Sequence, residues 1–226
     1  MDTNTFIVKC PHCKATKKIG FSVNTASLGN YEFWSDSRIE GGGWIEPAYT
    51  QQCPVCGKFY TLPPNNTLKT KKEECKETGF LSYPLLKSAV REFAGDEIPE
   101  ARARLEAWWA FNSLYNDPSD APIEEQEYNR ANMQWLIDYH TPRATRFIHL
   151  LFELNRLMGN KEVCEQMIEA LTFEEYVRQR NERHKERGFI SKLDDQWVRD
   201  MYDSEIKELK FAMEQPLKTY IKYPND

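Results

Sequence analysis

The sequence lacks long apolar runs, a strong excess of either charge, and the N-terminal apolar core of a signal peptide. None of its hydrophobic stretches approaches the ~18 residues of a membrane span. Lys plus Arg number 30 and Asp plus Glu number 35, which argues against a surface that coats nucleic acid or anionic lipid throughout. We therefore expect a soluble, cytoplasmic protein that does not bind membranes.

Histidine is scarce, and the spacing of the histidines matches no common catalytic motif. The four histidines are His12, His140, His149 and His184. There is no Glu-x-x-His pair, no two-histidine helix face and no nucleophile elbow. His149 lies in an apolar run, so a satisfied, partly buried histidine is expected there, and His140 reads as a helix-end residue. The sequence names no catalytic residue, and we expect a non-enzymatic protein.

Cysteine carries the strongest signal. Four of the 6 cysteines form two Cys-x-x-Cys motifs, Cys10–Cys13 and Cys53–Cys56, and Cys75 and Cys164 stand alone. A two-residue gap allows both thiolates of a motif to face one ion, at ~2.3 Å from zinc. Segment 14–52 is longer than the ~15–20 residues of compact zinc ribbons, which predicts an inserted loop or hairpin. We predict one structural Zn²⁺ held by Cys10, Cys13, Cys53 and Cys56.

Three alternatives remain beside structural zinc. A disulfide framework would suit a secreted protein. Iron in a rubredoxin-like shell uses the same four thiolates. A dithiol redox site is the third, because Cys10-Pro11-His12-Cys13 is similar to the active-site motif of the periplasmic disulfide oxidases. That chemistry needs a helix that starts at the first cysteine, and only a short segment precedes the strand-like residues 19–23.

The two cysteine motifs also differ in their flanking residues, and His12 lies inside the first. Gly57 follows Cys56 and can take the positive φ expected there, whereas Lys14 follows Cys13 and fits the pattern less well. We expect His12 to face solvent and not to bind the metal. Cys75 is expected to be a surface thiol, and Cys164 to be a small core residue.

The hydrophobic period changes near residue 80, which divides the chain into two predicted domains. Residues 1–80 predict a small β zinc-ribbon domain, with β segments at 5–9, 17–23, 47–52 and 58–62 leading into and out of the cysteine motifs. Residues 81–226 predict an all-α domain of helical hairpins. Within it, residues 157–160 (Leu-Met-Gly-Asn), Cys164 and Ala170-Leu171 resemble the helix–turn–helix of a tetratricopeptide repeat, which implies a degenerate tetratricopeptide-like array. The predicted fold class is α+β.

Seven helices are predicted in the second domain from their start and stop residues. Ser82 and Pro84 begin the first, Pro99 the second and Pro122 the third. Thr141-Pro142 is expected to cap a fourth that ends at Gly159, and a short helix follows through Leu171. Thr172 to Glu175 predicts a capping box for a helix that ends at Gly188, and Ser191 is expected to cap the last helix. The paired acids Glu124-Glu125 and Asp194-Asp195 fall in predicted first turns, where the helix dipole explains them.

An insertion rich in aromatic residues and glycine spans residues 31–49. It contains Tyr31, Phe33, Trp34, Trp44 and Tyr49 around Gly41-Gly42-Gly43. Such residues can form a platform for a peptide or a base. They can equally cover the ribbon or attach it to the next domain, which small ribbons need, and this second interpretation is favoured.

Charge is distributed unevenly between the two predicted domains. Residues 1–80 carry 10 basic and 8 acidic side chains, and residues 81–226 carry 20 and 27. Nucleic-acid binding therefore remains open to the ribbon alone. The basic cluster of residues 178–187 is interleaved with acids and precedes Gly188, so a solvated helix end with a Glu174–Arg178 pair is expected there.

The order of these features resembles a group of uncharacterised bacterial proteins that join an N-terminal zinc ribbon to C-terminal tetratricopeptide-like helices. The resemblance depends on residues 33–36 (Phe-Trp-Ser-Asp), 53–57 (Cys-Pro-Val-Cys-Gly), Arg104 and the Trp108-Trp109, Phe111-Asn112 group. It implies the two-domain architecture and no activity.

From these features we expect a non-enzymatic zinc-binding module that interacts with a protein or peptide. A nucleic-acid-binding zinc ribbon is the first alternative, and a rubredoxin-like or dithiol redox protein is the second.

Overall fold

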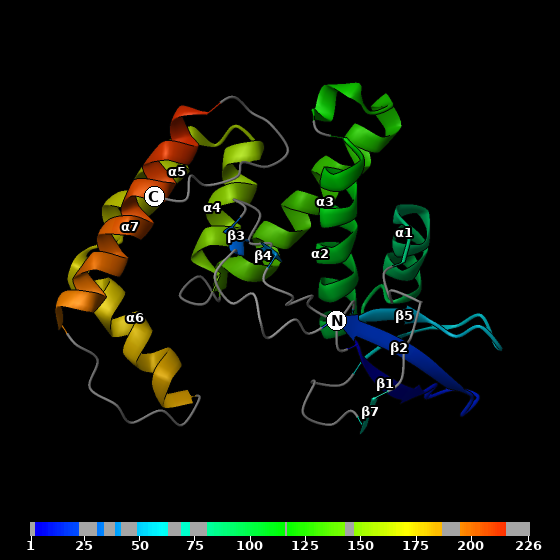
Figure 1. Cartoon of the computed structure of the whole chain (residues 1–226). Helices are drawn as coiled ribbons and strands as arrows, with labels where there is room; N and C mark the ends of the chain where they lie inside the picture. Colours follow the sequence, from blue (N-terminus) through cyan, green and yellow to red (C-terminus); the bar gives the residue numbers. More distant parts are fainter. Residues whose placement is uncertain are drawn as a thin grey trace. The chain divides into compact units, whose positions relative to one another are not determined.

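The structure is a computed structural model, and it describes residues 3–22, 31–33, 39–41, 49–62, 69–72, 81–115, 117–142, 147–186 and 195–215. Short strands occupy the N-terminal part of the described chain, and helices follow (Figure 1). The fold is therefore mixed α+β with mostly helical content, as predicted in these coarse terms. Among the described helices, none combines the length and the apolarity that a membrane crossing requires.

The strands pair as antiparallel hairpins. They are β1 (Thr3–Lys9), β2 (Thr16–Ser22), β3 (Tyr31–Phe33), β4 (Ile39–Gly41), β5 (Thr50–Gln52), β6 (Phe59–Thr61) and β7 (Lys69–Lys72). One sheet has the order β2-β1-β7, and β3–β4 and β5–β6 each form a separate pair. The predicted strands on both sides of each cysteine motif are confirmed. The pairing of β7 with β1 and the short β3–β4 pair were not predicted.

We call β1–β2 and β5–β6, with their turns, the cysteine hairpins. They share a small apolar core in which Val8 and Ile19 of the first pack with Tyr60 and Leu62 of the second. Cys10 and Cys53 belong to the same core and are each 2 % exposed. So few apolar residues supply little hydrophobic free energy, and a hairpin pair of this size needs further support.

The seven predicted helices are all present, with shifted boundaries. They are α1 (Tyr83–Glu92), α2 (Glu97–Leu114), α3 (Ile123–His140), α4 (Ile148–Leu157), α5 (Lys161–Ala170), α6 (Phe173–Glu186) and α7 (Asp195–Glu214).

The expected start of α2 at Pro99 was late, because the helix begins at Glu97 and Pro99 lies in its first turn, where its missing N–H costs nothing. The capping box at Thr172 is half formed: Thr172 Oγ1 accepts from Glu175 N at 3.2 Å, while the Glu175 carboxylate binds Arg178.

Two further helix predictions need correction or lie outside the description. Thr141-Pro142 does not cap α4. Thr141 ends α3 in helical conformation, and its hydroxyl donates to Ile137 O at 2.7 Å. Phe147 instead precedes α4. Ser191 and Gly188 fall outside the described residues.

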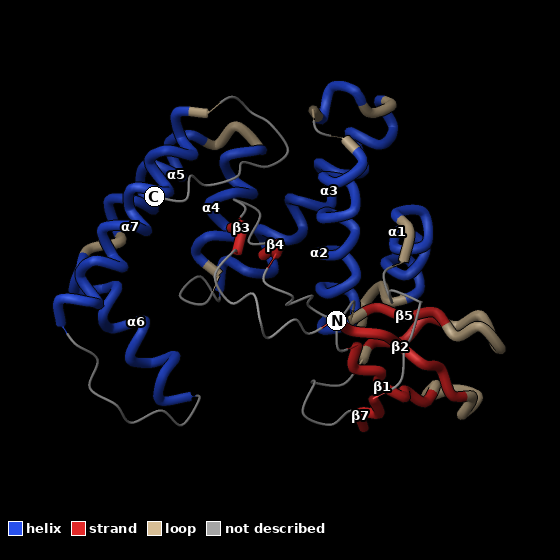
Figure 2. Tube along the Cα trace, in the orientation of Figure 1, coloured by secondary structure: helices blue, strands red, loops and turns tan. Residues whose placement is uncertain are grey.

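The chain divides into two compact units, and the division falls after Tyr115. Unit 1 comprises residues 1–33 and 38–115, and unit 2 comprises 34–37 and 116–226. The boundary predicted near residue 80 coincides with the change from strands to helices. The compact unit nevertheless extends past it, because α1 and α2 belong with the strands of unit 1. In Figure 2, β5 is the strand nearest these two helices, and it contacts α2.

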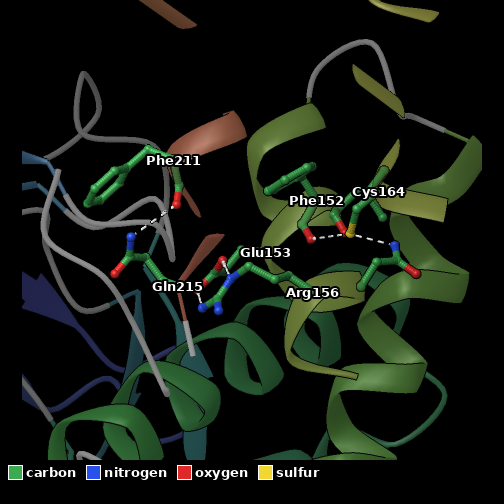
Figure 3. A network of polar contacts seen from close by, with 8 residues as sticks. Phe152, Glu153, Arg156, Cys164, Phe211 and Gln215 are labelled. Atoms are coloured by element: carbon green, nitrogen blue, oxygen red, sulfur yellow. Dashed lines mark hydrogen bonds and ion pairs between the residues drawn. The ribbon is translucent and has the colours of Figure 1, made fainter. Parts of the chain in front are cut away.

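The core of unit 2 is built around α4, whose residues 150–156 are all buried. Phe152 packs with residues of the following helices, namely Cys164, Leu171, Tyr176, Val198, Leu209 and Ala212. Gly159, at φ +80°, ends α4, and Cys164 of α5 donates from its sulfur to Phe152 O at 3.5 Å (Figure 3). The α4–α5 turn at Gly159 and the buried Cys164 are as predicted.

A buried ion pair lies in the same helix. Arg156 Nε and Nη2 donate to the two carboxylate oxygens of Glu153 at 2.6 and 2.7 Å, one turn apart on α4 (Figure 3). The side chains are 4 % and 1 % exposed. Each charge is tolerable at this depth only because the other neutralises it with bidentate geometry.

Candidate metal centre

The two Cys-x-x-Cys motifs form turns with the same backbone hydrogen bonds. Cys10 N donates to Ala15 O at 2.8 Å, and Lys14 N donates to Cys10 O at 3.0 Å. In the second turn Cys53 N donates to Lys58 O at 3.0 Å, and Gly57 N donates to Cys53 O at 2.9 Å. The two turns therefore present their cysteine pairs through one repeated geometry.

The residue after each motif takes the left-handed conformation. Gly57 has φ +71°, as expected for glycine, and Lys14 has φ +65° at the equivalent position. A side chain in this region costs roughly 1–2 kcal/mol. The first motif, whose sequence fits the pattern less well, therefore forms the same turn as the second, with a strained lysine in place of glycine.

The four sulfur atoms converge. Every pair lies within 4.8 Å, and Cys10 and Cys13 face Cys56 and Cys53 at 3.8 and 3.5 Å respectively. A tetrahedron with 2.3 Å zinc–sulfur bonds has sulfur separations of about 3.8 Å. A disulfide would need about 2.05 Å, and the cysteines are free thiols. The cluster therefore has the spacing of a four-thiolate metal site, and the geometry does not identify the metal.

The sulfurs influence one another's ionisation. The pKa of Cys53 is lowered to about 6, chiefly because the backbone N–H of Cys56 donates to its sulfur. The N–H of Lys58 lowers the pKa of Cys56, but burial and the three neighbouring sulfurs together raise it to about 11. Burial, with the four sulfurs adding to it, raises the pKa of the neighbouring Tyr60 to about 12. Cys53 therefore ionises readily while Cys56 does not, and a bound cation would favour the thiolate form of the cluster.

The second cysteine hairpin is attached to the helices of unit 1 through its edge backbone groups. Glu106 of α2 accepts from Tyr49 N at 2.7 Å and from Thr50 N at 3.1 Å. Arg102, one turn earlier, donates to Leu62 O at 3.1 Å, and its guanidinium lies 4.7 Å from the centre of the Tyr49 ring. In α1, Glu92 accepts from Phe59 N at 3.3 Å. Charged side chains thus satisfy backbone groups at the edges of a two-stranded hairpin.

Glu106 is the central residue of this attachment. It is 7 % exposed, and burial raises the pKa of its carboxyl to about 7, even though the N–H groups of Thr50 and Tyr49 and the Arg102 charge lower it. Sequence reasoning missed this residue. The available signal was an acid directly before the apolar Ala107 and Trp108, where a helix expected to bury that face has no place for an unpaired carboxylate.

His12 links the two hairpins. Its side chain is exposed, as expected, but Nε2 lies 3.2 Å from Phe59 O in the second hairpin. The carbonyl accepts from this ring nitrogen, so His12 holds the turns together without joining the sulfur cluster.

The remaining candidates from the sequence are structural where they are described. His149 Nε2 lies 2.8 Å from Glu205 Oε1, and His140 is buried at the end of α3. Arg178 pairs with Glu175 at 2.6 Å, so the prediction that named Glu174 was wrong by one residue. Of the aromatic insertion only Tyr49 has a described side chain, and it contacts Arg102 of the same unit. Cys75, Trp34, Trp44 and the side chains of Tyr31 and Phe33 lie outside the described residues, as do those of residues 182–187.

Comparison of the chain with protein-family models, with curated proteins and with solved structures found no significant match. The description of this site therefore depends on its own geometry.

Glu106 predicts a pH dependence of stability. Its folded pKa of about 7 lies above the ordinary 4.5, so the native state binds the proton more tightly than the unfolded state. Its contribution to stability is therefore fully present below pH 4.5 and is lost as pH rises through about 7. The free energy of unfolding of the wild type relative to Glu106→Gln should fall by on the order of 2–3 kcal/mol between pH 5 and 8. Urea titrations of both proteins at each pH measure this difference in the free energy of unfolding. Glu97→Gln, which neutralises an exposed acid of the same helix, is the matched control, and a constant difference for Glu106→Gln would contradict the prediction.

The left-handed Lys14 predicts a stabilising substitution. Lys14→Gly relieves the strain of about 1–2 kcal/mol but increases the entropy of the unfolded chain, for a net gain of about 0.5–1 kcal/mol. Gly57→Ala should cost about 1 kcal/mol through strain alone, because no atom lies within 4 Å of the added Cβ. Urea unfolding of the protein as purified measures the free energy of unfolding of both variants. Lys14→Ala separates strain from the contact of Lys14 Nζ with Pro11 O, and an equal loss in Lys14→Ala and Lys14→Gly would show that the contact dominates.

Proposed function

We propose that the chain binds one structural Zn²⁺ through Cys10, Cys13, Cys53 and Cys56, and that the cysteine hairpins form a zinc ribbon. The observation that carries the proposal is the convergence of four free thiols within 4.8 Å from two turns of identical backbone geometry. Zinc favours a closed shell of four thiolates when it serves a structural role. The ion would contribute binding free energy to a pair of hairpins whose apolar core is small.

The redox alternatives differ in how well they fit. A dithiol oxidase needs Cys10 at the start of a helix, and the chain from Cys10 to Ser22 forms a turn and then β2. Rubredoxin-like iron has the same ligand geometry as zinc and is distinguished by its visible thiolate-to-iron absorption. Iron is therefore an outcome of the metal analysis below.

We further propose that the zinc ribbon stabilises a non-enzymatic protein-interaction module, whose helical hairpins in unit 2 are tetratricopeptide-like. The α4–α5 hairpin with its Gly159 turn supports the comparison. Trp197 of α7 supports the interaction role, because it is 47 % exposed and the Arg180 guanidinium lies 4.8 Å from the centre of its ring. Tryptophan and arginine are among the residue types that contribute most at protein interfaces.

Elemental analysis tests the metal proposal. Protein purified without chelators should contain about one zinc per chain, and Cys53→Ser should lose most of it because three thiolates bind far more weakly. Cys164→Ala, which removes a cysteine outside the cluster, should keep full zinc content. Metal-free wild type would refute the proposal, and a coloured protein carrying iron would replace zinc with the rubredoxin-like alternative.

Affinity capture with the full chain tests the interaction proposal. A partner that binds the Trp197 surface should be retained in a defined stoichiometry by the wild type and weakened at least about tenfold by Trp197→Ala, since interface tryptophans contribute 2 kcal/mol or more. Ile123→Ala, at an apolar residue that is 75 % exposed on α3, is the matched control. Equal capture by all three proteins would refute a role for this surface.

A further inference from the structure

The described cysteine hairpins carry charge of one sign. Residues 3–22 and 49–62 contain no aspartate or glutamate and have five lysines: Lys9, Lys14, Lys17, Lys18 and Lys58. β7, which pairs with β1, has the sequence Lys-Thr-Lys-Lys. Four thiolates around a divalent cation would carry two negative charges, so the lysines exceed what the cluster needs for neutralisation.

The register shows how these lysines are placed. Lys9 pairs with Thr16, so Lys18 lies diagonally across from Lys9 on the same face of the β2-β1-β7 sheet. The opposite face holds Val8 and Ile19, which are 3 % and 1 % exposed and form the core. Lys9 and Lys18 therefore lie on the outward face, and both side chains are exposed. Lys14 and Lys58, also exposed, lie at the two turns that meet at the sulfur cluster.

The described acids of unit 1 that contact the hairpins do not offset this charge at the outward face. Glu106 and Glu92 bind backbone N–H groups of the second hairpin, on its side toward α1 and α2. Glu100 pairs with Arg104 at 2.8 Å within α2. Among the described side chains, the exposed surface of Lys9, Lys14, Lys18 and Lys58, which we call the lysine surface, thus has a local positive charge on a chain whose net charge is −5.

The composition of the lysine surface favours a nucleic acid over an acidic protein. Protein interfaces are depleted in lysine and depend on aromatic or apolar anchors. The aromatic side chains described in these hairpins, Phe59 and Tyr60, are both 5 % exposed and so are not available as anchors, and Tyr49 is occupied by Arg102. Val55, at 72 % exposed, is the one large apolar side chain that the described hairpin residues leave in solvent, which is less than a protein interface needs. Phosphate groups are bound by lysine as a point charge, with no apolar burial required.

We propose that the lysine surface binds the phosphate backbone of nucleic acid and does not read base sequence. This inference goes beyond the proposed protein-interaction function and involves residues of unit 1, whereas Trp197 belongs to unit 2. Since base readout requires side chains that reach base edges or stack on bases, affinity should depend on salt and not on sequence.

Fluorescence anisotropy with the full-length protein tests the proposal. The probe is a labelled 20-nucleotide RNA of mixed sequence, measured in 50 and 200 mM salt, with a second RNA of unrelated sequence beside it. Lys9→Gln combined with Lys18→Gln should weaken binding by about tenfold or more in 50 mM salt and reduce the salt slope by about 2. Lys161→Gln combined with Lys210→Gln makes the same charge change at exposed lysines of unit 2 and should stay within about twofold of the wild type.

Zinc content and circular dichroism of both double variants should match the wild type, which separates a lost contact from a lost fold. Absence of binding in 50 mM salt would overturn the proposal, as would an equal loss in the unit 2 variant. A poly-glutamate peptide that competes as well as unlabelled RNA would also overturn it, in favour of an acidic protein partner. A strong preference between the two RNAs would overturn the sequence-independent mode.

Discussion

Mutual repulsion among four sulfur atoms is the constraint on which the first unit depends. Two thiolates 3.8 Å apart repel by on the order of 4 kcal/mol at an effective dielectric constant of 20, and the cluster contains six such pairs. The neighbouring sulfurs, together with burial, hold the pKa of Cys56 at about 11, whereas a backbone N–H lowers that of Cys53 to about 6. A divalent cation bound between the sulfurs would attract all four thiolates and so offset their mutual repulsion. It would act at the point where two turns distant in sequence meet. A structural ion would therefore explain why a pair of hairpins with so small a core keeps a defined geometry.

The second support of the hairpins comes from the helices and is electrostatic as well. A two-stranded hairpin leaves backbone groups unpaired at both edges, and Glu106, Arg102 and Glu92 bind groups of this kind in the second hairpin. The arrangement has a cost, because Glu106 is buried and its pKa rises to about 7. Without these helix side chains, a further strand would be needed to bind the same backbone groups. The arrangement also explains why the compact unit extends to Tyr115 instead of ending where the strands end.

The sequence predicted those features that are local and missed those that depend on distant partners. Cys-x-x-Cys spacing, helix periodicity and the Gly159 turn are read within a few residues, and the cluster of four cysteines, the seven helices and the α4–α5 hairpin followed from them. The attachment through Glu106 joins residues far apart along the chain and has no local signature beyond an acid in an apolar run. At Thr141-Pro142 a local pattern was present but misleading. It matches a helix cap, yet the threonine hydroxyl bonds the Ile137 carbonyl of the preceding helix instead. Lys14 shows that a turn specified by two cysteines imposes its φ on a residue that does not favour it.

The two turns are equivalent in backbone geometry and unequal in surroundings, and this inequality suggests different roles. The second has the glycine that the turn favours, and helix side chains bind its flanking strands, so its position within unit 1 is determined. The first retains a strained lysine, and its strands contact the second hairpin through the shared core and through the His12 to Phe59 bond. A glycine at position 14 would be the more stable residue there, so the strained lysine is retained at a cost in stability. Its amine adds to a surface that already carries Lys9, Lys18 and Lys58. Binding of an anionic partner by the first hairpin would account for that cost, since the attachment of the second hairpin to α1 and α2 does not involve Lys14.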